Sequence, residues 1–175
     1  MNFAHLLNVI TCFSNFRAPM SLFNCGKMQL STKLTGDYNM ANLVEYLSEA
    51  HQLMSFATVA DNHPSVRTVG FGYDEAEPGV FYIVTKPEST KVGEVEGNEN
   101  VAFSTFPGTG GKRVSTNQAI AKVSDKPFSA IAHLFKDNAG WKAGHPHPEE
   151  ETILEVHVKS VLLESFVEAP ASITF

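Results

Sequence analysis

The chain has 175 residues, of which 43% are hydrophobic and 18% are charged, so it is long enough for one domain with a buried core. Its formal net charge is −6. Residues 1–39 hold three of the 13 basic residues and one of the 19 acidic ones, which leaves 10 basic and 18 acidic residues in the remainder. This acidic remainder excludes binding to nucleic acid through bulk charge. No apolar run is long enough to span a bilayer, so we also expect no membrane partner.

Both cysteines, Cys12 and Cys25, lie within residues 1–39. The remainder can therefore contain neither a disulfide framework nor a thiolate metal site. A reducing compartment fits this distribution, and we expect a cytoplasmic protein.

Residues 1–39 show no sustained helical or strand period. We expect them to be either a disordered extension or the product of translation started upstream of the true start. Met40 opens a helical pattern in which Leu43, Leu47 and Ala50 stand at i, i+4 and i+7. This spacing predicts a helix with one apolar face.

After this helix, short runs rich in β-branched and aromatic residues alternate with turns rich in Asn, Pro and Gly. Strands are predicted over residues 54–60, 65–73, 80–85, 101–106 and 112–124, and again from 154. Turns are predicted at 61–64, 74–79 and 107–111, short helices over 86–97 and 127–135, and a polar loop over 136–152. Most strand connections are too short for crossover helices. The pattern therefore favours a mainly β fold, a small antiparallel barrel of about six strands with a few short helices.

The last predicted strand has the clearest alternation in the chain. Its apolar residues Leu154, Val156 and Val158 alternate with Glu155, His157 and Lys159. A strand with one buried face produces this period of two, so we expect Glu155 to face solvent.

Cations and hydroxyl side chains gather where the predicted strands end. Arg67 lies within the strand 65–73, and the strand 80–85 leads into Thr85, Lys86, Ser89, Thr90 and Lys91. A guanidinium fork suits phosphate, and the N-terminus of the following helix would add free N–H donors. Five of the ten basic residues after position 39 flank these strand ends: Arg67, Lys86, Lys91, Lys112 and Arg113. In an acidic chain this clustering predicts a site for a phosphate-bearing ligand.

Each of these residues also has a purely structural explanation. Arg67 alone would be a cation on a solvated strand face, Ser89 and Thr90 would cap a helix, and Lys91 would be a surface lysine. His145 and His147, at i and i+2 in a loop of prolines and glutamates, lack the spacing of zinc motifs, and we expect no metal site.

Three ordered pieces of sequence carry a family resemblance. They are Phe56-Ala57-Thr58-Val59, then Val66-Arg67-Thr68-Val69-Gly70-Phe71, then Thr85 followed by Ser89-Thr90-Lys91. In this order and spacing the chain resembles the pyridoxamine 5′-phosphate oxidase-like family of FMN-binding split β-barrels, over roughly residues 40–166. The resemblance implies a six-stranded antiparallel split barrel over residues 40–168, followed by a C-terminal tail over 169–175.

The resemblance also implies roles for individual residues. Arg67 would bind the FMN phosphate or ribityl chain, and the backbone of Thr68, Val69 and Gly70 would meet the edge of the flavin ring. Thr90 stands where the oxidases usually have Arg, so Lys86 or Lys91 must supply the second phosphate cation. A polar residue near Lys112 would approach the ring. Trp141, the only tryptophan, would either cover a flavin face or plug the barrel.

The resemblance implies an assembly, a cofactor and a class of reaction, but it does not identify the substrate. It implies a homodimer with FMN in the groove between two barrels, and a flavin-dependent oxidoreductase that acts on an unknown small molecule with an unknown electron donor. Any nicotinamide donor would have to bind transiently at the flavin face, because the chain lacks a G-x-G-x-x-G fingerprint. A haem- or deazaflavin-binding barrel is an alternative. So is a non-catalytic flavin carrier or sensor, because no acid–base residue for a substrate stands out. A true pyridoxamine 5′-phosphate oxidase is not expected, since Arg17, Arg67 and Arg113 are the only arginines and no Trp follows Trp141.

Overall fold

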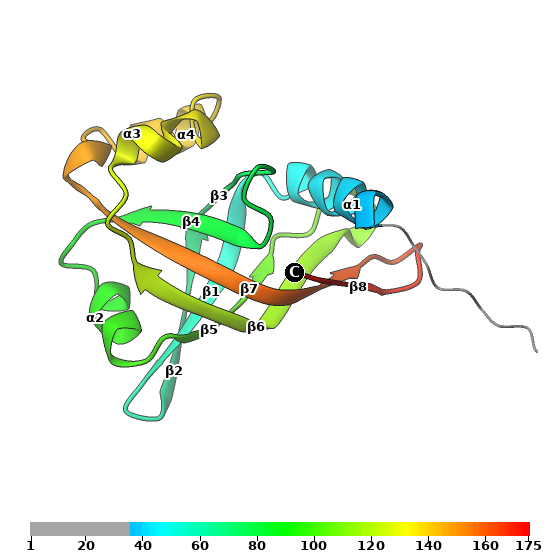
Figure 1. Ribbon diagram of the computed structural model, residues 1–175, viewed down its shortest axis with the longest axis horizontal. Coiled ribbons are helices and arrows are strands. Elements are labelled where there is room, and N and C mark those ends of the chain that lie inside the picture. Colours follow the sequence, from blue (N-terminus) through cyan, green and yellow to red (C-terminus); the bar gives the residue numbers. More distant parts are fainter. Residues whose placement is uncertain (1–35) are drawn as a thin grey trace, which may run out of the picture. The chain divides into compact units, whose positions relative to one another are not determined.

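A computed structural model describes residues 36–175, in which an antiparallel sheet curls around a core and carries short helices at its rims (Figure 1). The strands are β1 (Leu53–Ala60), β2 (His63–Gly70), β3 (Gly72–Tyr73), β4 (Val80–Thr85), β5 (Asn100–Thr105), β6 (Arg113–Val123), β7 (Thr152–Glu164) and β8 (Ala171–Thr174). The α-helices are α1 (Gly36–Glu49), α2 (Thr90–Gly97), α3 (Phe128–Ile131) and α4 (Ala139–Gly144), and 3-10 turns span Thr109–Gly111, Ala132–Leu134 and Pro148–Glu150. None of the helices in this part of the chain is long and apolar enough to cross a membrane.

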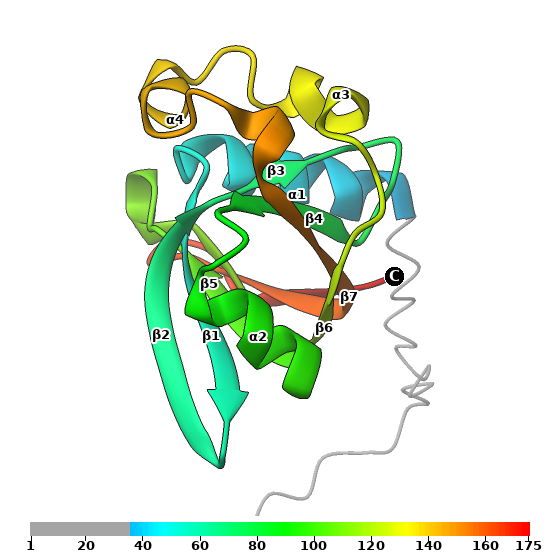
Figure 2. The ribbon, with the colours of Figure 1, turned by 90° about the vertical axis from the view of Figure 1, so that its left-hand side faces the viewer.

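The strands run in the order β2-β1-β5-β6-β7-β4-β3, with β8 paired to β7, and every pairing is antiparallel. Only Phe71 separates β2 from β3, yet these strands stand at opposite ends of the order. The sheet must therefore curl until its two ends meet, which Figure 2 shows from the side. The predicted mainly β split barrel is confirmed. It has eight strands where about six were expected, because the predicted strand 65–73 is divided at Phe71 into β2 and β3, and because β8 is too short to form a recognisable sequence pattern.

The barrel core is apolar and α1 closes one end of it. Phe56, Phe81 and Leu154 are fully buried, and the predicted apolar face of α1, formed by Leu43, Leu47 and Ala50, is buried against them. The helix begins at Gly36, four residues before the predicted start, because polar residues can extend a helix beyond its apolar repeat. The predicted extension over residues 1–39 otherwise lies outside the described residues.

The connection between β1 and β2 is a tight hairpin. Asp61 and Asn62 have φ angles of 49° and 62°, as a two-residue turn of the type favoured by strand twist requires. His63 and Pro64, predicted as part of the turn, instead begin β2. Pro64 is tolerated there because β2 ends the strand order and its outer edge makes no ladder hydrogen bonds.

A second apolar cluster covers the outer face of β4 and β7. Tyr82, Val84 and Ile153 pack there against Phe135 and Trp141 from the α3–α4 region, which lies beyond one end of the sheet in Figure 1.

Two expectations fail in this region. The predicted polar loop over 136–152 contains α4, whose first turn is capped by Asn138 through a 2.8 Å bond from the Trp141 backbone N–H. Glu155, expected in solvent, is only 6% exposed, because the outer face of β7 is covered at this point. Elsewhere in the fold, the segment 169–175, expected as a tail, contains β8, whose Ile173 is buried against the barrel.

Candidate functional site

Three polar side chains share the inner face of the sheet at the end of the barrel near α2. Arg67 pairs with Phe56 across β2 and β1, so it lies on the same inward face as that core residue. Thr58 continues the inner face of β1 and is fully buried, and Thr85 ends β4 with 7% exposure. Strand alternation therefore turns a cation and two hydroxyls toward the interior, where an apolar core would otherwise continue.

Helix α2 lies over this end of the barrel (Figure 2). Its residues Val92 and Val95 are buried, and Val95 belongs to the barrel core. Lys91 and Glu94, which stand one position before each valine, are only partly buried and reach the three inward polar residues. The helix thus places one cation and one carboxylate at the site while its valines hold it in place.

Arg67, Thr58 and Glu94 form a closed set of hydrogen bonds. The guanidinium donates from Nη1 to Thr58 Oγ1 at 2.5 Å and from Nη2 to Glu94 Oε2 at 2.6 Å. The Thr58 hydroxyl in turn donates to Glu94 Oε2 at 2.5 Å. The Thr58 hydrogen bond holds the pKa of Glu94 below its ordinary value; burial opposes this shift, and the Arg67 charge reinforces it. Glu94 is therefore ionised at neutral pH.

Lys91 lies beside this set with its own hydroxyl partners. Its Nζ donates to Thr85 Oγ1 at 2.7 Å and to Ser89 Oγ at 2.5 Å. Burial lowers the pKa of Lys91, and the nearby Arg67 charge lowers it further, whereas Glu94 and Glu151 raise it. Ser89 precedes α2, but within the described residues its side chain makes no capping hydrogen bond to the helix. The Val92 N–H donates to the Ser89 carbonyl at 2.9 Å, whereas the N–H groups of Thr90 and Lys91 have no partner among the described residues and are available to an anion.

Further along β2, Gly70 meets the α4 helix. A Cβ added to Gly70 would lie 2.9 Å from Trp141 Cδ1 and 3.5 Å from Trp141 Nε1. The indole is 8% exposed, and its Nε1 has no hydrogen-bond partner among the described residues. Thr68 is exposed and Val69 is buried. Trp141 therefore stands beside the stretch of β2 that the sequence predicted to meet a flavin.

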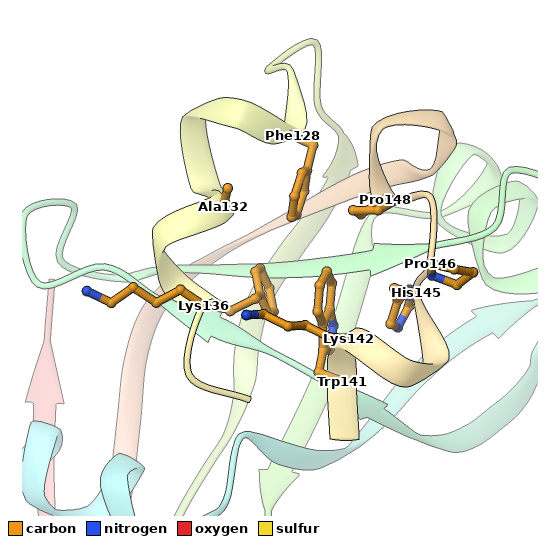
Figure 3. Close-up of a pocket in the computed structure, with 9 residues that line it drawn as sticks. Phe128, Ala132, Lys136, Trp141, Lys142, His145, Pro146 and Pro148 are labelled. Carbon is orange, nitrogen blue, oxygen red and sulfur yellow. The ribbon is translucent and has the colours of Figure 1, made fainter. Parts of the chain in front are cut away.

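Trp141 also lines a pocket of about 440 Å³ (Figure 3). Trp141 stacks against Phe135 and His145 with ring centroids 4.3 and 4.4 Å away, and Phe128 lies across the hollow from this row. The pocket is also lined by Ala132, Lys136, Lys142, Pro146 and Pro148. Its walls are mainly apolar and aromatic, as small-molecule pockets usually are.

The sequence profile of the pyridoxamine 5′-phosphate oxidase family matches residues 40–164, which cover the barrel from α1 to the end of β7. The chain belongs to this family. No curated protein matches it in sequence.

Solved structures agree with the family at the level of the fold. A putative pyridoxamine 5′-phosphate oxidase from Listeria innocua superposes with a TM-score of 0.57 at 17% identity, covering 71% of this chain and 97% of that one. An FAD-binding protein from Mesorhizobium loti gives 0.54 at 15% identity, with 69% and 89% covered. A haem-binding protein from Mycobacterium smegmatis gives 0.56 at 12% identity, with 74% and 57% covered. Identities this low show a shared fold alone.

Within this barrel, some of the predicted site residues come together and others do not. Arg67, Thr85, Ser89 and Lys91 converge near the start of α2. Thr90 begins α2 and is exposed, as is Lys86 in the preceding turn.

Lys112 is held at a different place. It pairs with Glu45 and Glu49 of α1 and lies 5.5 Å from the centre of the Tyr46 ring. Helices α1 and α2 lie at opposite ends of the barrel in both views (Figure 1). Lys112 therefore anchors α1, and its contacts give it no part in the Arg67–Lys91 cluster.

Thr58 and Glu94 were not predicted as site residues. Thr58 stands in one of the family motifs, and its place in strand alternation puts it inside the barrel. Glu94 follows Lys91 by three residues, the spacing at which helical side chains become neighbours. These two signals could have indicated both residues.

Proposed function

We propose that this chain binds FMN and supports flavin-linked redox chemistry. The observation that carries the proposal is the convergence of Arg67 and Lys91 at the start of α2. In a chain whose net charge is −6, two partly buried cations beside three hydroxyls form a local site for an anion. The phosphate of FMN would bind Lys91, Ser89, Thr85 and the free N–H groups of α2. It would also accept a hydrogen bond from the guanidinium of Arg67, which keeps its bonds to Thr58 and Glu94.

The state of Lys91 supports a phosphate at this position. Burial and the Arg67 charge both lower its pKa, which means that both disfavour its charged form. A bound anion would offset both effects, because its negative charge favours the charged form of Lys91. Arg67 has five N–H donors, and its bonds to Thr58 and Glu94 use two of them.

The flavin ring would lie along Thr68, Val69 and Gly70 of β2, where the Trp141 Nε1 atom is buried without a partner in the described structure. A buried donor of this kind usually has a partner, and a ring nitrogen or carbonyl of a flavin would serve as one. The bound flavin would supply the electron transfer, and the protein would supply binding, orientation and local electrostatics. The pocket that Trp141 lines is open to a small apolar molecule.

The outer face of the sheet supports a homodimer. Strand register places four exposed apolar residues on this one face: Leu53 (36%), Val66 (67%), Ile120 (40%) and Leu162 (36%). Thr68 lies on the same face, because it pairs with Ser55, two residues from Leu53 along β1. We propose that a second copy of the chain covers this face and closes the flavin groove.

The first test is the visible absorbance of the freshly purified protein. A flavin gives two bands in the near-ultraviolet and blue, a deazaflavin gives a single violet band, and haem gives a Soret band. The haem and deazaflavin alternatives are thereby separated from FMN. Bleaching of the flavin bands by NADH or NADPH without oxygen would indicate an enzyme, and the absence of bleaching with either donor would favour a carrier or sensor.

The phosphate contacts are tested by comparing FMN with riboflavin, which lacks the phosphate. Each charge-assisted hydrogen bond contributes about 1.5–3 kcal/mol, so Lys91→Ala and Arg67→Ala should each weaken FMN binding at least about tenfold. Riboflavin affinity should change little in either variant. Lys159→Ala, which removes an exposed lysine of β7, is the charge control. Equal losses for both ligands would point to unfolding, and unchanged FMN affinity would contradict the proposed site.

A further inference from the structure

The carboxylate of Glu94 binds the guanidinium of Arg67, which the phosphate in the proposed FMN site would also contact. Its Oε2 atom accepts hydrogen bonds from Arg67 Nη2 at 2.6 Å and from Thr58 Oγ1 at 2.5 Å. The Arg67 and Glu94 side chains are only 22% and 15% exposed. The charge therefore lies at the predicted phosphate site and is poorly reached by solvent.

Glu94 changes the charge of this site. Arg67 and Lys91 together carry two positive charges, and the ionised carboxylate reduces the sum to one. The Glu94 charge also acts on Lys91. It raises the pKa of Lys91, whereas burial and the Arg67 charge lower it. Charges that are partly withdrawn from water are weakly screened by solvent and salt. A phosphate dianion that entered the site would meet both the reduced positive charge and the carboxylate itself.

We propose that Glu94 is a specificity-determining residue that weakens the binding of phosphate-bearing ligands at this site. The inference rests on the proposed FMN function. With Glu94 present, the phosphate of FMN adds less to the affinity of the flavin than Arg67 and Lys91 would give it without this carboxylate, and FMN is exchangeable rather than permanently bound. An exchangeable flavin is what a flavin carrier requires, and also what an enzyme that uses flavin as a substrate requires.

Glu94→Gln is the direct test, because it removes the charge and retains the shape of the side chain. The amide oxygen can still accept the hydrogen bonds from Arg67 and Thr58. Dissociation constants for FMN and riboflavin are measured with the full chain by quenching of flavin fluorescence. We expect FMN to bind at least about tenfold more tightly, equivalent to about 1.4 kcal/mol, with riboflavin unchanged. Glu96→Gln is the matched control, since it removes an exposed carboxylate from the same helix and should change neither affinity.

The outcomes separate this inference from the proposed function. If wild type binds FMN but Glu94→Gln does not bind it more tightly, Glu94 only orients Arg67 and the inference is wrong, while the FMN site remains. Equal tightening for FMN and riboflavin would also overturn it. If neither protein binds FMN, both proposals fall. Tight FMN binding by the variant alone would support both. Should Glu94→Gln fold poorly, Glu94→Ser removes the same charge without adding volume and carries the same expectation.

Discussion

Gly70 and Trp141 come so close that a Cβ on the glycine would lie 2.9 Å from the indole Cδ1. The contact joins β2 to α4 and brings the only tryptophan to the strand that would meet a flavin. Gly70 therefore serves close packing, because only a residue without a side chain permits this approach.

Replacing Gly70 with alanine should displace Trp141. Overpacking of this kind typically costs about 1–3 kcal/mol in the free energy of unfolding, and the displaced indole should emit at a longer wavelength because it gains contact with water. Chemical denaturation and tryptophan fluorescence measure both effects. Gly93→Ala is the control: in the described structure a Cβ there would meet nothing within 4 Å apart from its chain neighbours and the backbone of its own helix, and alanine in this helix should be neutral or stabilising. Unchanged emission from Gly70→Ala would contradict the proposed packing.

Glu155 should make stability depend on pH. Burial raises the pKa of Glu155, but hydrogen bonds from Ser124, His157 and Lys122, together with the Lys126 charge, outweigh it and leave the pKa below the ordinary value of 4.5. The unfolded chain then binds a proton more readily, so this carboxylate stabilises the fold above pH 4.5 and the gain is lost as pH falls below that value.

The matching experiment compares wild type with Glu155→Gln by urea denaturation between about pH 7 and pH 3. Loss of a charged hydrogen-bond acceptor should lower the free energy of unfolding by about 1–3 kcal/mol at neutral pH. The difference between the two proteins should shrink on acidification. Glu150→Gln, at an exposed position, should follow wild type throughout. A difference that stays constant with pH would contradict the role given to this carboxylate.

We expect Lys112 to stabilise the packing of α1 and to contribute little to FMN affinity. Lys112→Ala should lower the melting temperature, because it removes the partner of Glu45 and Glu49, and should leave FMN affinity within about twofold of wild type. Lys112→Met should recover part of the melting temperature through its apolar stem, which can still cover Tyr46. Weaker FMN binding with an unchanged melting temperature would instead indicate that Lys112 contacts the cofactor.

The exposed apolar face of the sheet predicts a dimer in solution. Sedimentation equilibrium of wild type should give twice the chain mass at micromolar concentration, and Val66→Glu should give a monomer, because a charge cannot be buried unpaired in an apolar interface. Val167→Glu is the control, at an equally exposed valine between β7 and β8. A monomeric wild type that still holds cofactor would contradict the proposed dimer.

Pyridoxamine 5′-phosphate itself should not be a substrate. Both arginines of residues 36–175 are already paired, Arg67 with Glu94 and Arg113 with Glu164, and recognition of a second phosphate depends strongly on such cations. The FMN-loaded protein should release no hydrogen peroxide above background when pyridoxamine 5′-phosphate is added. Robust release would overturn this prediction.

The sequence was informative where neighbouring residues determine the structure. The runs 54–60 and 80–85 predicted β1 and β4, because dense β-branched and aromatic residues leave few alternatives. The α4 helix was missed, because Gly140 and Gly144 make its short sequence read as a loop. Its cap by Asn138 became visible only in the structure.

The candidate site was predictable in its cations but not in their partners. Arg67 and Lys91 follow from motifs that can be read along the chain. Glu94 contacts Arg67 across 27 residues of sequence, and Lys112 contacts Glu45 across 67. A pattern that describes only neighbouring residues does not identify such partners, because the curl of the sheet decides which of them meet.

Helix α2 joins the proposed ligand site to the core through neighbouring residues that face in different directions. Lys91 and Glu94 reach the site, whereas Val92 and Val95 are buried. A ligand that binds only the folded chain stabilises it in proportion to the logarithm of its concentration. Added FMN should therefore protect the backbone amides of α2 from hydrogen exchange, although in the proposed site it would touch only one side of the helix. Conversely, a substitution such as Val95→Ala would appear in a screen as a loss of cofactor, although the residue never contacts it.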